Sequence, residues 1–132
     1  MHLIVCVDNH LGMAFNGRRQ SRDRVLCSRI SALASGSRLL MAPGSGLLFE
    51  NQPVILDPDY LASARDGDYC FAEFPPLAAW EDRAERLILC RWNRVYPADQ
   101  FLDLELSRWH KISQEDFPGS SHETITMEVY EK

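Results

Sequence analysis

The start of the chain carries the feature that most restricts its fold. Leu3-Ile4-Val5-Cys6-Val7 is an unbroken apolar run, and Asp8-Asn9 ends it. A short apolar run without alternation predicts a strand buried on both faces, which is typical of the interior of a parallel sheet. Parallel strands need long crossover connections. We therefore expect strands separated by helices or long loops.

The rest of the chain fits that expectation. Residues 9–20 predict a long loop, and Ser21 is the expected N-cap of a helix that stops near Gly36. Further strands are predicted at 38–41, 53–56, 68–72 and 85–92, with short helices at 47–51, 58–64 and 77–84. A strand at 109–113, an acidic loop at 114–123 and an alternating strand at 124–130 close the chain. The predicted fold is α/β: a mixed, mostly parallel sheet with flanking helices and an antiparallel C-terminal strand pair.

Length and composition favour a soluble globular protein with one domain, residues 1–132. No apolar run approaches the roughly 18 residues of a membrane span, and the apolar start lacks a basic leader. Cysteines 6, 27, 70 and 90 are widely spaced and never form a CxxC pair. We expect free thiols in a reducing compartment, hence a cytoplasmic protein, and no metal site.

Charge is unevenly distributed along the chain. The net charge is −5, yet five arginines fall between positions 18 and 29: Arg18, Arg19, Arg22, Arg24 and Arg29. This cluster predicts either a solvated helix face or an anion site for phosphate or carboxylate. The acidity of the whole chain makes general nucleic-acid binding an unfavoured function.

The order of these segments resembles that of dihydrofolate reductases. The N-terminal strand 3–8, the Gly-containing loop and the basic helix are similar to that family's first strand, mobile loop and substrate helix. The C-terminal pattern from Asp99-Gln100-Phe101 through Trp109 to Tyr130 is also similar. The resemblance covers nearly the whole chain, which is identified as a shortened, divergent member.

The resemblance implies candidate site residues. Asp23 is in the place of the carboxylate that relays a proton and holds the pterin ring, so it is the candidate catalytic residue; helix capping alone is the alternative role. The candidate substrate-binding residues are Cys6, Arg19, Arg22, Asp23 and Cys90. The candidate cofactor-binding residues are Gly44, Ser45, Ala72 and Glu73. The family's Met-Gly-Arg-x-Thr turn appears as Met41-Ala42-Pro43-Gly44-Ser45, and its glycine pair as Ala72-Glu73.

These replacements set the functional expectation. Pro43 stands where the family has an arginine for a phosphate of NADPH, and Glu73 adds charge where a dianion should lie. NADPH is therefore expected to bind weakly, and no cofactor is assigned. We expect a protein that binds a small heteroaromatic or nucleotide-like ligand. Two alternatives stay open: an NAD(P)H-dependent reductase of a pterin-like substrate, and a protein- or RNA-interaction module using the Arg18–Arg29 patch.

Overall fold

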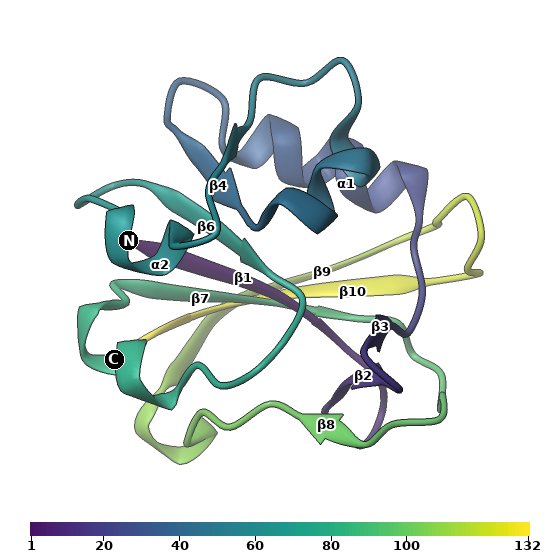
Figure 1. Ribbon diagram of the computed structural model, residues 1–132. Helices are drawn as coiled ribbons and strands as arrows, with labels where there is room; N and C mark the ends of the chain where they lie inside the picture. Colours follow the sequence, from purple (N-terminus) through teal and green to yellow (C-terminus); the bar gives the residue numbers. More distant parts are fainter.

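A computed structural model describes all residues, 1–132, and its centre is a seven-stranded sheet (Figure 1). In spatial order the strands are β5 (Ile55–Leu56), β4 (Leu39–Met41), β6 (Tyr69–Ala72), β1 (His2–Val7), β7 (Arg86–Arg91), β10 (Ile125–Glu131) and β9 (His110–Phe117). The first five are parallel, whereas β10 runs antiparallel to both β7 and β9. The predicted mixed sheet with an antiparallel C-terminal pair is confirmed.

The apolar run at the start of the chain forms an interior strand, as predicted. β1 pairs with β6 on one side and β7 on the other. Leu3 and Val5 face one core layer, and Ile4 faces the second layer; all three are fully buried. Burial on both faces explains why this segment shows no polar alternation.

The longest helix, α1 (Arg24–Leu33), covers one face of the sheet with Leu26 and Ile30 (Figure 1). The 3₁₀ helix η1 (Pro43–Phe49) lies beside it. Short elements pack on the opposite face: α2 (Tyr60–Ser63), and the 3₁₀ helices η2 (Ala78–Arg83) and η3 (Leu106–Arg108). The helices predicted at 47–51 and 77–84 are thus 3₁₀ turns. No helix has the length and apolar character needed to cross a membrane.

The first helix begins later than predicted. Its N-cap is Asp23 rather than Ser21, because the Asp23 backbone is extended and its carboxylate accepts hydrogen bonds from the N–H groups of Val25 and Leu26. This shift moves Ser21 out of the helix and into the chain that leads to it. Ser21 therefore keeps its hydroxyl available for other partners.

The long loop predicted at 9–20 is wrong in part, because it contains a hairpin. β2 (Gly12–Phe15) and β3 (Arg18–Arg19) pair across Asn16-Gly17, and β8 (Gln100–Phe101) completes a second, three-stranded sheet. Both turn residues have positive φ, 53° and 73°, as a two-residue hairpin turn requires. The small sheet lies past the carboxyl end of β1 (Figure 1).

The acidic loop predicted at 114–123 is also wrong in part, in its first four residues. β9 continues to Phe117, so the connection to β10 spans only residues 118–124. Two polar contacts keep the acidic residues in the strand: Arg29 pairs with Glu115, and the Thr126 hydroxyl donates to Asp116 at 2.7 Å. The short connection folds back against the start of α1, which matters for the site.

Candidate functional site

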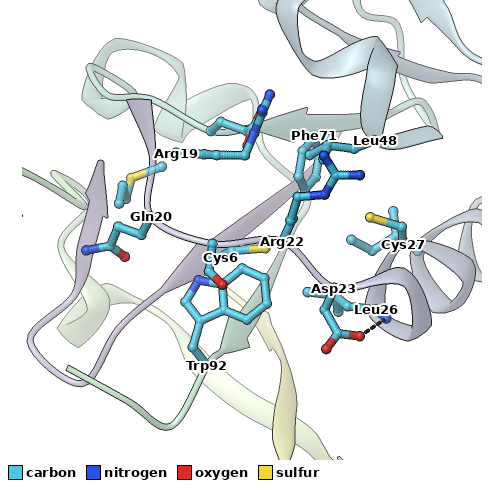
Figure 2. Close-up of a pocket in the computed structure, with 14 residues that line it drawn as sticks. Cys6, Arg19, Gln20, Arg22, Asp23, Leu26, Cys27, Leu48, Phe71 and Trp92 are labelled. Carbon is cyan, nitrogen blue, oxygen red and sulfur yellow. Dashed lines mark hydrogen bonds and ion pairs between the residues drawn. The ribbon is translucent and has the colours of Figure 1, made fainter. Parts of the chain in front are cut away.

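A small cavity lies at the carboxyl ends of β1 and β6, beside the chain that enters α1 (Figure 2). Its walls include the side chains of Cys6, Leu26, Phe71 and Trp92. The enclosed volume is about 20 Å³, which is room for about one water molecule. In this closed form the cavity cannot hold an aromatic ring.

A wider groove continues outward from this cavity. It lies between α1 and the end of η1, has a volume of about 300 Å³, and shares Arg22, Cys27 and Leu48 with the cavity. Figure 2 shows the Arg22 side chain extending toward Leu48 and Phe71. Arg22 is exposed and makes no ion pair, unlike Arg19 and Arg29. The groove therefore offers a free cation in a mostly polar lining, which also holds Arg24 and Glu50, with Leu47 and Leu48 as its apolar part.

Arg19 and Glu73 close the other side of the cavity. The Arg19 Nε donates to Glu73 Oε2 at 2.7 Å and its Nη2 donates to Glu73 Oε1 at 2.9 Å. The same Nη2 reaches the Gly44 carbonyl at 2.8 Å, and the Ser45 hydroxyl donates to Glu73 at 2.7 Å. We call these four residues the clamp. It ties the β2–β3 hairpin to the end of β6 and to η1.

The clamp contains one residue predicted to bind substrate, Arg19, and three predicted to bind the cofactor. The structure brings them together, but they hydrogen-bond to one another. Gly44 and Ser45 also line a surface hollow of about 410 Å³, whereas Ala72 is fully buried within β6. Arg19, which borders this hollow, is committed to Glu73. This set is a poor fit for the phosphates of NADPH, because the Glu73 carboxylate bonds to Arg19 and Ser45, and only Arg18, exposed at the edge of the hollow, makes no ion pair.

Asp23 lies at the cavity wall, but its carboxylate turns toward the start of α1 (Figure 2) and bonds to the 118–124 connection. Both oxygens accept several hydrogen bonds, from the backbone of Val25, Leu26, Ser120 and Ser121, the Ser120 hydroxyl and the His122 ring. Burial opposes ionisation, yet the hydrogen bonds from His122, Ser121, Ser120 and Leu26 outweigh it, so the pKa of Asp23 lies far below its usual range. Arg19 and Arg22 do not pair with it.

His122 is the residue that sequence reasoning missed. The stretch Ser120-Ser121-His122-Glu123 predicts a solvated turn, and this is wrong for His122, which is only 5% exposed. Its ring stacks on Trp92 with centroids 4.5 Å apart, and its Nδ1 lies 3.0 Å from Asp23 Oδ2. The Ser21 hydroxyl and the Tyr96 hydroxyl lie 3.1 Å and 2.9 Å from its Nε2. No spacing in the sequence links positions 23, 92 and 122.

The pKa values of two cysteines that line the cavity, Cys6 and Cys27, are raised. Cys6 and Cys90 face each other across β1 and β7, and their contact, with burial, raises the pKa of Cys6 well above its usual value. Burial, and then the charge of Glu73, raises the pKa of Cys27 to about 11. Cys90 is buried and is not among the partners of Asp23. All four cysteines are free, and no group of three or more His, Cys, Asp or Glu side chains is placed to hold a metal ion.

Comparison with known proteins places the fold. A dihydrofolate reductase from Enterococcus faecalis, in complex with NADP(H) and RAB-propyl, superposes with a TM-score of 0.67 and 11% sequence identity. The match covers 98% of this chain and 94% of that protein. No protein-family model and no curated protein matches the sequence. The chain thus has a dihydrofolate-reductase-like fold with strongly diverged sequence, and at this identity the likeness establishes the fold alone.

Proposed function

We propose that this protein binds a small heteroaromatic or nucleotide-like ligand that carries a negative charge. One observation carries the proposal: an unpaired cation, Arg22, borders a groove that adjoins the small cavity, and the buried aromatic side chains of Phe71 and Trp92 line that cavity. A guanidinium pairs well with a phosphate or carboxylate, and aromatic walls suit a flat ring. The cavity that the groove adjoins lies at the carboxyl ends of the parallel strands β1 and β6, where open α/β sheets bind ligands.

The groove and the cavity suggest a division of roles. The groove volume of about 300 Å³ matches the lower end of ligand pockets. The ligand's anionic end pairs with Arg22 in the groove, and its ring points toward Phe71. A ring enters the cavity only if the clamp opens, since about 20 Å³ is too small for it. Binding is then coupled to movement of the β2–β3 hairpin, which carries Arg19.

The same geometry supports a binding role more than reduction by a nicotinamide cofactor. Reduction needs a bound NAD(P)H, and in the clamp Arg19 bonds to Gly44 and Glu73 while Ser45 bonds to Glu73, which leaves none of them free for phosphates. Proton delivery by Asp23 is likewise disfavoured, because its low pKa and its full set of partners keep the carboxylate ionised. Asp23 instead fixes the start of α1, and thereby the position of Arg22.

A thermal-shift screen against pterins, nucleotides and NADPH tests the proposal. We expect an anionic pterin or a nucleotide to raise the melting temperature, and a 100-fold excess over the dissociation constant stabilises a protein by about 2.7 kcal/mol. Any ligand that binds is then mixed with NADPH while the nicotinamide absorbance is followed. Loss of that absorbance would replace our proposal with the reductase. Absence of any stabilising compound would reject ligand binding at this groove.

A further inference from the structure

A second chemical constellation lies on the wall of the cavity. Ser21, His122 and Asp23 form a continuous chain: the Ser21 Oγ lies 3.1 Å from His122 Nε2, and His122 Nδ1 lies 3.0 Å from Asp23 Oδ2. The carboxylate only accepts hydrogen bonds, so Nδ1 carries the proton and Nε2 of the neutral ring is an acceptor. The Ser21 hydroxyl can therefore donate to a ring nitrogen that is able to take its proton.

Capping of α1 explains the contacts of only one of the two Asp23 carboxylate oxygens. Asp23 Oδ1 accepts from the first N–H groups of the helix, but Oδ2 faces His122 and the Ser121 N–H. The His122 ring is fixed from a third side, because it stacks on Trp92. A serine hydroxyl is activated by a neighbouring base, and a buried carboxylate can hold that base in one tautomer and one orientation. His122 and Asp23 have this arrangement.

Ser21 also has the surroundings that a nucleophile needs. It lines the cavity, which has room for only about one water molecule, but Ser21 is only partly buried, so a small acyl group can approach it from the solvent side. The N–H groups of the next two residues, Arg22 and Asp23, donate to no backbone carbonyl. Such free N–H groups next to a nucleophile can stabilise the oxyanion of a tetrahedral intermediate. The Arg22 side chain adds a positive charge nearby.

We propose that Ser21, His122 and Asp23 are a catalytic triad that hydrolyses esters with a small acyl group. Ser21 Oγ forms a bond to the acyl carbon while its proton moves to His122 Nε2. The ester C–O bond then breaks, and the leaving alcohol oxygen takes the proton from Nε2. Water attacks the acyl-serine in the same way, releasing the acid and restoring Ser21, so ester and water give acid and alcohol. This activity is independent of the ligand-binding proposal.

A variant of Tyr96 serves as a control for the role of Ser21. Its hydroxyl lies 2.9 Å from His122 Nε2 and 3.4 Å from Ser21 Oγ, so it competes with Ser21 for the same ring nitrogen. Tyr96→Phe removes this competitor and leaves the triad in place. We expect Ser21 to become at least as reactive in this variant.

The test uses an alkyl fluorophosphonate, which reacts stably only with activated serines, together with p-nitrophenyl acetate. We expect one phosphonyl group per chain, located on Ser21 by peptide mass spectrometry, and release of p-nitrophenolate. Ser21→Ala should abolish both, and His122→Gln should slow both by about a hundredfold or more, as expected for loss of a general base. Ser107→Ala, a serine in η3 far from the cavity, is the matched control and should react as wild type.

Circular dichroism establishes which variants are folded. If His122→Gln does not fold, Ser21→Ala and Tyr96→Phe decide the question. Equal labelling of Ser21→Ala and wild type, attachment of the probe to a residue other than Ser21, or no labelling in folded wild type would overturn the triad. Loss of reactivity in Tyr96→Phe would also overturn it, since the hydroxyl would then be required.

Discussion

The carboxylate of Asp23 and the imidazole of His122 lie 3.0 Å apart although 99 positions separate them in the chain. Both side chains are almost fully buried. The contact fastens the connection between β9 and β10 to the first turn of α1. It fixes three things at once: the start of the helix, the direction of Arg22 and the position of the Ser21 hydroxyl.

Asp23→Asn should destabilise the protein by about 2 kcal/mol or more. An exposed N-cap contributes about 1 kcal/mol, but here the substitution also leaves His122 and two loop N–H groups without a charged acceptor in a buried place. Urea unfolding measures the cost. Asp82→Asn, at an exposed aspartate of η2, is the matched control and should change stability by less than about 0.5 kcal/mol. An equally small change for Asp23→Asn would contradict the account.

The stability of the protein should fall with acidification partly because of Asp23. Its pKa is lowered in the folded state, while an aspartate in the unfolded chain has a pKa of about 3.9. Below about pH 4 the unfolded state therefore binds a proton that folded Asp23 does not, and the free energy of unfolding decreases as the pH falls. Asp23→Asn lacks this contribution.

Urea midpoints at several pH values between about 5 and about 3 check this sign. The variant should lose less stability than wild type over that range. Asp8 and Asp68 also have lowered pKa values, but they contribute to both proteins and cancel in the difference. Parallel pH profiles for the two proteins would show that the Asp23 carboxylate is not stabilised by folding.

Gly119 should be intolerant of even one added methyl group. A Cβ at this position would clash with Asp23 Oδ2 and lie 2.9 Å from Ile125 Cδ1, so the connection would have to move away from Asp23. Overpacking of this kind costs about 1–3 kcal/mol. Gly44→Ala is the matched control, because a Cβ there meets no atom within 4 Å. Similar melting temperatures for the two variants would contradict the close approach.

Particular residues show what sequence could and could not predict. The apolar run 3–7 and the alternating strand 124–130 predicted the sheet, because the spacing of apolar residues along a strand indicates which of its faces are buried. Asn16-Gly17 carried a hairpin signal that the prediction of a loop overlooked. No local sequence pattern predicts the hydrogen bond between Asp23 and His122, because it depends on how the 118–124 connection folds over α1. The pairing of Arg19 with Glu73 is equally non-local.

NADPH should bind weakly, with a dissociation constant well above micromolar. The resemblance to dihydrofolate reductases puts Pro43 in the place of a phosphate-binding arginine, and one lost charge-assisted contact costs roughly 1.5–3 kcal/mol, about ten- to a hundredfold in affinity. Glu73→Gln removes a negative charge from this region and should tighten binding by about tenfold, whereas Glu123→Gln, in the exposed connection, should not. Submicromolar binding to wild type, measured by calorimetry, would refute this prediction.

Calorimetric titration of the Arg22→Ala variant tests the central claim most directly. The titrant is the anionic pterin or nucleotide that stabilises wild type most in the thermal-shift screen. Arg108→Ala is the control, because η3 leads into β9 where His110 pairs with Glu131, at the end of the sheet opposite the cavity. Loss of the ion pair should weaken binding about tenfold or more in Arg22→Ala, with Arg108→Ala unchanged. Equal affinities in the two variants, or no binding to wild type by any compound of the screen, would contradict the account.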